Sequence, residues 1–215
     1  MLKIFSSKVL ETAFFSDEKL FQVKQQYKTE NDVLYVPKTA KKRDIPDERI
    51  NREQSGFPQK VMLSVAISKA GKTLVLFVDP GAKVDSKYYT LDLLKKMIPQ
   101  MNRLAQGDYL FMQDGARSHT FKLTLNHLGK YKHLKLLEPH QWPPNSPDLN
   151  PLDYSTWRML ETNVYHGRRI NRHEYTETSH RAKLPQDVIT KSIDTFRERL
   201  KRVVEVQGRH IEKYL

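Results

Sequence analysis

Short apolar segments, separated by polar stretches, constrain the fold of this chain more than any other feature of its sequence. Most of these segments are rich in β-branched and aromatic residues, which is typical of strands. Strands are predicted over residues 13–15, 33–36, 61–67, 73–78, 109–112 and 134–137. None of the segments approaches the length of a membrane span, and no membrane partner is expected.

Helical spacing of apolar residues marks three further segments, residues 88–104, 121–128 and 186–206. In the first of these, one apolar stripe would face the core, made of Leu91, Leu94, Met97, Ile98 and Met101. Along the chain, strands come first and then alternate with helices. This order predicts an α/β domain, in which a mixed sheet is flanked by helices and pairs in parallel in its later part.

The chain has 215 residues, the usual size of a single α/β domain, and no internal repeat divides it. Residues 37–59 and 166–185 are polar and basic, so we expect a loop in each place. Each is explained equally well as a functional segment or as a solvated connection. If these loops bind a polyanion, the candidate contacts are Lys41, Lys42, Arg43, Arg168 and Arg169.

The charge balance points to a polyanionic partner. There are 37 Lys and Arg residues against 25 Asp and Glu, which gives a formal net charge of +12. Such an excess favours contacts to phosphate, so nucleic acid is the leading candidate. The alternatives are general solubility and binding to any anionic surface.

The absence of cysteine excludes disulfides, thiolate metal sites and cysteine nucleophiles, and an intracellular compartment fits this composition best. The opening residues lack the apolar stretch and cleavage site of a signal peptide. The run KTAKKRD at residues 38–44 would serve as a nuclear import signal, although short basic runs are more often solvated loops.

The first acidic residue in an unusual setting is Asp17, within FFSDEKLF. A carboxylate flanked by apolar residues on a predicted central strand is costly to bury unless its charge is compensated. A metal ion would compensate it, and so would a salt bridge to a neighbouring lysine. From the residues alone, a metal ion and a salt bridge are equally well supported.

The second acidic residue is Asp114, which follows the apolar run 109–112 and precedes Gly115. It therefore stands at the carboxyl end of a predicted buried strand, where ligands gather in open α/β sheets. The alternative is a structural aspartate in a strand-to-helix turn that Gly115 allows.

The third acidic residue is Asp153, in the proline-rich string WPPNSPDLNPLDY. Asn150 and Pro151 form a good cap and first residue of a helix, which makes Asp153 its third residue. The carboxylate is thus held at the first turn. For an isolated aspartate there, an acid that complements the helix dipole would be the better explanation.

Other polar residues are weaker candidates. Arg117 and His119 follow Asp114 closely and would reach a phosphate, although a helix start explains them equally well. Trp142 and Trp157 lie beside apolar or proline-rich sequence and are interpreted as core residues rather than platforms for base stacking.

Three blocks, FSDEKLF, QDGARSHT and WPPNSPDLNPLDYSTW, occur in this order and resemble the signature blocks of mariner-type DDE/D transposases. The stretches VMLSVAISKAGKTLVLF, VDSKYYTLDLLKKMIPQM and FRERLKRVVEVQGRHIE resemble the same superfamily, so nearly the whole chain is covered. The resemblance implies an RNase H-like catalytic domain. Its three catalytic acids fall by motif on Asp17, Asp114 and Asp153, in preference to the neighbouring Glu18 and Asp148.

The same resemblance implies cleavage of DNA strands and their transfer to new sites with two Mg²⁺ or Mn²⁺ ions, for which oxygen ligands are well suited. Asp17 would bind both metal ions, Asp114 one and Asp153 the other. The implied partner is DNA, in the nucleus. Residues 37–59 resemble in placement the segment by which mariner-type subunits clasp one another and DNA, so a homodimer or association with full-length transposase is expected.

Members of this family usually carry two helix-turn-helix modules before the catalytic domain. Only 16 residues precede Asp17, so we expect those modules to be absent and DNA binding to be mainly electrostatic. Two functions stay open, an active DNA-cleaving and joining core and a catalytically unused or co-opted DNA-binding remnant. A general RNase H-like nuclease is a third, against which the SPDLNPLDY block argues.

Overall fold

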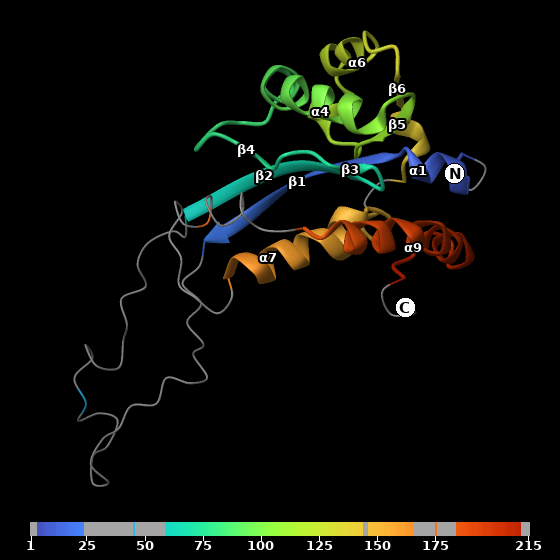
Figure 1. Cartoon of the computed structure of the whole chain (residues 1–215). Helices are drawn as coiled ribbons and strands as arrows, with labels where there is room; N and C mark the ends of the chain where they lie inside the picture. Colours follow the sequence, from blue (N-terminus) through green and yellow to red (C-terminus); the bar gives the residue numbers. More distant parts are fainter. Residues whose placement is uncertain are drawn as a thin grey trace.

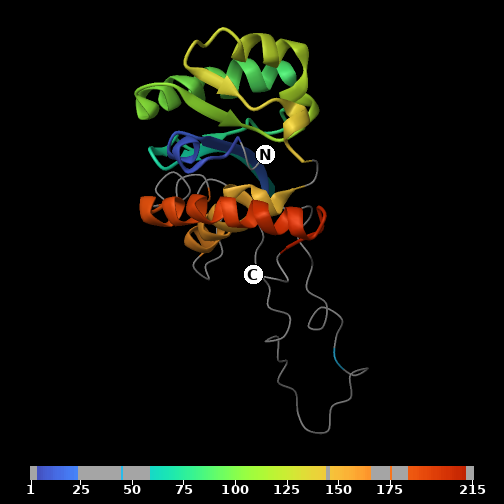
Figure 2. The same cartoon turned by 90° about the vertical axis from the view of Figure 1, so that its right-hand side faces the viewer.

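The computed structural model describes residues 4–23, 45, 59–143, 146–165, 175 and 184–211. These residues form three layers, with one sheet between two layers of helices (Figures 1 and 2). Within these ranges, no helix is both long enough and apolar enough to cross a membrane.

The sheet is mixed, and its order is β3-β2-β1-β5-β6, with β4 pairing separately with β2. β1 is antiparallel to β2 and parallel to β5, and β5 is parallel to β6. The predicted parallel pairing in the later part of the sheet is therefore confirmed. The strands are β1 (Phe14–Val23), β2 (Gln59–Ser68), β3 (Gly71–Lys72), β4 (Leu76–Phe77), β5 (Tyr109–Met112) and β6 (Leu134–Leu136).

Helices cover both faces of the sheet. One layer holds the continuous helical segment of α3 (Ser86–Tyr88), η3 (Tyr89–Leu94) and α4 (Lys95–Ala105), together with α5 (Arg117–Thr120) and α6 (Lys122–Leu128). The other layer holds α7 (Trp157–Tyr165) and α9 (Gln186–Glu205). The remaining helical elements are α1 (Ser7–Glu11), η4 (Pro139–Gln141), η5 (Pro147–Leu149) and η6 (Leu152–Thr156).

Alternation along β1 divides the interior into two cores, because successive side chains of a strand point to opposite faces. Phe15 and Phe21 pack in the core beneath α7 and α9, with Trp157 and Phe196. Phe14 packs in the other core, against η3 and α4. β1 thus contributes apolar side chains to both faces at its start, where Phe14 and Phe15 are both buried, while residues 17–19 in its middle are only partly buried.

The predicted apolar stripe of the helical segment 88–104 is correct from Leu94 onward and wrong at Leu91, which is 47% exposed. The reason is the π-helical turn η3, whose wider winding rotates the preceding residues. Tyr89, five residues before Leu94, is therefore fully buried, and Leu93 takes the core position predicted for Leu91.

Several other boundaries differ from prediction. β1 extends to Val23, well beyond the predicted residue 15, and the predicted strand 73–78 is reduced to the short β4. Helix α1, which the sequence analysis did not predict, is capped by Ser6, whose Oγ accepts from the Val9 amide. The C-terminal helix was predicted within one residue of α9. The predicted strand 33–36 lies outside the described residues, as does nearly all of the two predicted loops.

Candidate active site

Asp17 lies on β1 opposite Val65 of β2, on the face covered by α7 and α9. The indole Nε1 of Trp157, the first residue of α7, donates a hydrogen bond to Asp17 Oδ2 across 2.7 Å. Trp157 is itself fully buried in the core, as predicted. The Trp157 indole thus holds the Asp17 carboxylate in place, but as a neutral donor it leaves the charge of that carboxylate uncompensated.

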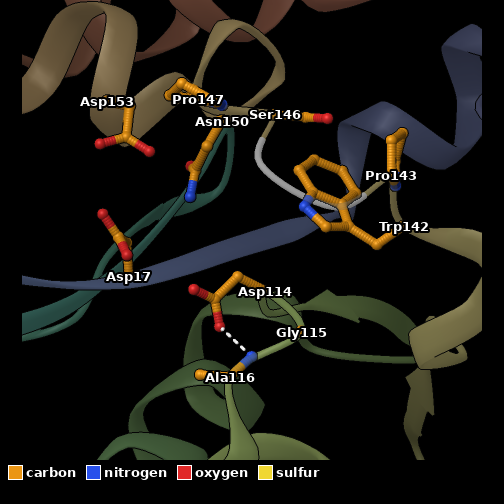
Figure 3. A pocket seen from close by; sticks show the side chains of 10 residues that line it. All are labelled: Asp17, Asp114, Gly115, Ala116, Trp142, Pro143, Ser146, Pro147, Asn150 and Asp153. Carbon is orange, nitrogen blue, oxygen red and sulfur yellow. Dashed lines mark hydrogen bonds between the residues drawn. The ribbon is translucent and has the colours of Figure 1, made fainter. Parts of the chain in front are cut away.

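Asp114 stands two residues beyond the end of β5, at the carboxyl edge of the sheet. Its Oδ1 accepts from the backbone amide of Ala116 across 2.9 Å and lies 2.6 Å from Nδ1 of His119. Figure 3 shows the other carboxylate oxygen turned away from Ala116, toward the side on which Asp17 lies. The turn after β5 therefore fixes Oδ1 of Asp114 and leaves Oδ2 directed toward the side of Asp17.

Asp153 lies in the first turn of the helix that continues into α7. Asn150 caps this helix, since its Oδ1 accepts from the Leu152 amide across 3.1 Å and its backbone carbonyl accepts from the Asp153 amide across 2.9 Å. Pro151 is the first helical residue. The cap predicted from sequence is confirmed, with Asp153 as the third residue of the helix.

The three aspartates line one cavity of about 370 Å³. In Figure 3 the carboxylates of Asp17 and Asp153 point toward each other, and Asp114 lies to one side of this pair, beside Gly115 and Ala116. The tertiary fold has therefore brought together β1, the end of β5 and the helix before α7. The remaining lining residues are Gly115, Ala116, Trp142, Pro143, Ser146, Pro147 and Asn150.

The pKa of Asp17 is raised to about 7, chiefly by burial and next by the nearby Asp153 carboxylate, against the lowering effect of the Trp157 hydrogen bond. Burial also raises the pKa of Asp153, while Lys19 opposes the shift. Two carboxylates that repel each other in a partly buried cavity lack a positive charge between them. A bound cation would supply it.

Asp114 differs from the other two acids. Burial favours its neutral form, but the hydrogen bond and positive charge of His119 outweigh that effect and lower its pKa. For His119, burial alone would lower the pKa, yet Asp114 and Glu18 together raise it to about 10. The two shifts favour the same charged pair, a protonated His119 beside an ionised Asp114.

His119 is 3% exposed and lies between two carboxylates. Its Nδ1 contacts Asp114, and its Nε2 lies 3.0 Å from Glu18 Oε2. Both ring nitrogens are used inside the protein, so the direct DNA contact considered for His119 does not fit this geometry. The DxxxxH spacing of QDGARSH was the signal for this pair, because five residues carry the chain from the end of β5 through the turn into α5.

The donor set is suited to a hard divalent cation, because Asp17, Asp114 and Asp153 offer only oxygen atoms. Among the described residues, no group of three or more Asp, Glu, His or Cys side chains is gathered closely enough to hold a metal ion without further ligands or a closer approach of the three carboxylates. Ligands from substrate or water would complete the coordination, as is usual for Mg²⁺. The residues present therefore fit an open metal site rather than a closed cage.

The two neighbouring acids are held elsewhere. Glu18 follows Asp17 on β1 and points to the opposite face of the sheet, where Ser64 Oγ donates to its Oε1 across 2.7 Å. Asp148 is 7% exposed, and its Oδ2 accepts from the backbone amide of Ile211 across 2.9 Å. Both acids have structural partners, which supports the choice of Asp17 and Asp153 by motif.

The predicted DNA contacts fall in different places. Arg117 is exposed at the start of α5, three residues after Asp114. Trp142, predicted to be a core residue, packs only partly against the core and lines the cavity. Five predicted contacts lie outside the described residues, namely Lys41, Lys42, Arg43, Arg168 and Arg169.

Comparison with known proteins identifies relatives by sequence, while no protein-family model matches the chain. Human histone-lysine N-methyltransferase SETMAR is 30% identical over 127 residues, which cover 57% of this chain and 18% of SETMAR. The Tcb2 transposase of Caenorhabditis briggsae is 27% identical over 61% of this chain and 48% of its own length. The Tc3 transposase of Caenorhabditis elegans is 31% identical over 49% of this chain and 30% of its own length. The chain thus spans less than half the length of these relatives.

Solved structures of the Mos1 transposase share the fold. Its paired-end complex with the left transposon end has a TM-score of 0.69 and 21% identity, covering 98% of this chain and 60% of that one. The Mos1 mariner catalytic domain has a TM-score of 0.65 and 19% identity, covering 98% of this chain and 90% of that one. The Mos1 paired-end complex with Mn has a TM-score of 0.63 and 20% identity, covering 94% and 57%. The predicted RNase H-like α/β fold is confirmed.

Proposed function

We propose that this chain, whose homologues are Tc1/mariner transposases, carries a metal-dependent catalytic core that cleaves DNA strands and joins them to new sites. One observation carries the proposal. Three aspartates from separate parts of the chain, Asp17, Asp114 and Asp153, line a single cavity. Neither general solubility nor nonspecific DNA binding requires this convergence.

Asp17, Asp114 and Asp153 would hold Mg²⁺ or Mn²⁺, and two such ions, when bound, would stabilise the charge that develops on the attacking and leaving oxygens at phosphorus. The protein's own part is to hold these carboxylates in place. Trp157 fixes Asp17, Asn150 fixes the turn that carries Asp153, and Ala116 with His119 fixes Asp114. Water would be the nucleophile for cleavage, and a DNA 3′-hydroxyl for joining.

The metal preference is supported by the oxygen-only donor set and by the paired-end complex of Mos1 with Mn. The proposed partner is DNA. The net charge of +12 favours phosphate contacts, and exposed Arg117 directly follows Ala116, which lines the cavity. Assembly into a homodimer, association with a full-length transposase and action in the nucleus follow from the resemblance to the family and belong to the same proposal.

The competing function is a DNA-binding protein whose catalytic residues are unused. Both functions predict DNA binding with a steep dependence on salt, so binding does not distinguish them. Catalytic turnover of DNA distinguishes them, because only the first function predicts it. The test is therefore cleavage and strand transfer on short DNA duplexes in Mn²⁺ or Mg²⁺, with the unchanged chain and the Asp114→Ala chain.

A matched control comes from the same strand region. Asp108 lies just before β5, at the end opposite Asp114, and contacts His133 and Lys135 on the surface. Asp108→Ala removes one carboxylate without touching the cavity, so it should cleave like the unchanged chain, while Asp114→Ala should fall to the level seen without metal. If all three chains bind DNA and none cuts or joins it, the binding function is correct instead.

A further inference from the structure

A partly buried path of polar contacts ends at Asp114 and joins β1 and β2 to α5. Ser64 on β2 donates to Glu18 on β1 across 2.7 Å. The other oxygen of Glu18 lies 3.0 Å from His119 Nε2, and His119 Nδ1 lies 2.6 Å from Asp114 Oδ1. The imidazole of His119 thus links Glu18, whose side chain is 11% exposed, to Asp114, whose side chain is 49% exposed.

The ring of His119 is held on other sides as well. The ring of Tyr89 packs on it with centroids 4.2 Å apart. The Tyr89 hydroxyl donates to the side chain of Gln113 across 2.9 Å, and Gln113 donates in turn to the backbone carbonyl of His119 across 3.1 Å. The tilted Tyr89 ring, the two contacts of the ring nitrogens and the bond to the His119 carbonyl together restrain the orientation of the imidazole.

Asp114 needs such a fixed partner because of its position. It lies beyond the end of β5 in a turn that contains Gly115, and about half of its side chain is exposed. A carboxylate in that position has several rotamers within reach. The contacts from His119 and from the Ala116 amide both fall on Oδ1, so they select the rotamer in which Oδ2 is directed to the cavity side (Figure 3).

We infer that His119 is a positioning residue, which orients Asp114 for a divalent cation while Glu18 anchors the imidazole ring. The inference rests on the proposed function, because it takes Asp114 as a metal ligand. Outer partners of this kind fix the orientation of ligating carboxylates, and their removal typically weakens metal affinity by about 10- to 100-fold. The competing explanation is purely structural, with His119 serving only to fasten α5 to β1.

The two nitrogens of His119 can be replaced one at a time. An asparagine amide nitrogen takes the approximate place of Nδ1, so His119→Asn keeps a donor toward Asp114 and loses the contact to Glu18. A glutamine amide nitrogen takes the approximate place of Nε2, so His119→Gln keeps the contact to Glu18 and loses the donor to Asp114. Each variant loses one of two hydrogen bonds, which makes them a matched pair for stability.

The experiment is a titration with Mn²⁺ alone, read by electron paramagnetic resonance, on the unchanged chain, both His119 variants and Asp114→Ala. Thermal unfolding of each chain without metal accompanies it. Positioning predicts that His119→Gln binds Mn²⁺ about 10- to 100-fold more weakly, while His119→Asn binds close to the unchanged chain. Equal Mn²⁺ affinity of the two variants would overturn the inference, whatever their melting temperatures.

If either His119 variant fails to fold, Glu18→Gln gives a second comparison. Its amide oxygen still accepts from His119 Nε2, so positioning predicts that the Mn²⁺ affinity is retained, and a tenfold loss contradicts it. Failure of the inference is distinct from failure of the proposed function. If the chains show the predicted order of Mn²⁺ affinities but never cleave DNA, the positioning role of His119 is supported and the proposed function is contradicted. If the unchanged chain binds no Mn²⁺ at all, both are contradicted.

Discussion

The indole of Trp157 donates a hydrogen bond to the carboxylate of Asp17, and this 2.7 Å contact joins residues 140 positions apart in the chain. It fastens the start of α7 to β1 at the cavity. One side chain therefore fills the core and also fixes a candidate metal ligand.

Trp157→Phe keeps an aromatic ring and removes the donor. Because it leaves a partly buried carboxylate without that partner, we expect the free energy of unfolding to fall by about 1–3 kcal/mol. Denaturation by urea in the presence of a chelator measures it. Trp142→Phe is the control, since that ring is only partly buried and its loss should have the smaller effect. Equal losses from the two changes would show that the hydrogen bond contributes nothing.

Asp17→Asn should change how stability depends on pH. The folded chain raises the pKa of Asp17 from 3.8 to about 7, so between these values the folded state holds a proton that the unfolded state has lost. Stability from this group is therefore highest at low pH and declines as the pH rises to about 7.

The asparagine variant lacks this decline. Relative to the unchanged chain without metal, it should gain roughly 2–3 kcal/mol between pH 5 and pH 8. Urea denaturation at the two pH values checks this gain. A difference between the two chains that stays constant with pH would mean that Asp17 keeps an ordinary pKa.

Asp153→Asn and Asp148→Ala should separate metal binding from structure. Asp153 faces the cavity, so its change should weaken Mn²⁺ binding by about tenfold or more. Asp148 accepts from the buried Ile211 amide, so its change should leave Mn²⁺ binding intact and reduce the free energy of unfolding by about 1–3 kcal/mol. Mn²⁺ titration and urea denaturation of both chains give the answer. The opposite pattern would make Asp148 the third acid.

Arg117→Ala should weaken binding to DNA of any sequence, since an exposed arginine near the cavity contacts phosphate rather than bases. The slope of log affinity against log salt should fall by about 1. Fluorescence anisotropy at several salt concentrations measures the slope. Arg197→Ala is the control, because Arg197 is also exposed but lies on α9, in a groove separate from the cavity. Slopes that fall equally in both chains would exclude a specific role for Arg117.

The sequence by itself singled out the three aspartates through the resemblance of their blocks to those of mariner-type transposases, and it determined the alternation of strands and helices and the cap at Asn150. The alternation and the cap are local properties. A strand repeats every two residues, a helix about every 3.6, and a cap needs only its own first turn, so each can be read from neighbouring letters. The wrong position of Leu91 marks the limit, since the π-helical turn that displaces it forms against the packed core.

Only the tertiary structure decided what each side chain meets. Alternation along β1 places Asp17 and Glu18 on opposite faces, but it does not reveal that one face receives Trp157 and the other His119. Those partners are 140 and 101 positions away, and their approach depends on how every layer packs. The same packing raises the pKa of Asp17, because burial and the nearness of Asp153 are properties of the folded chain and not of its sequence.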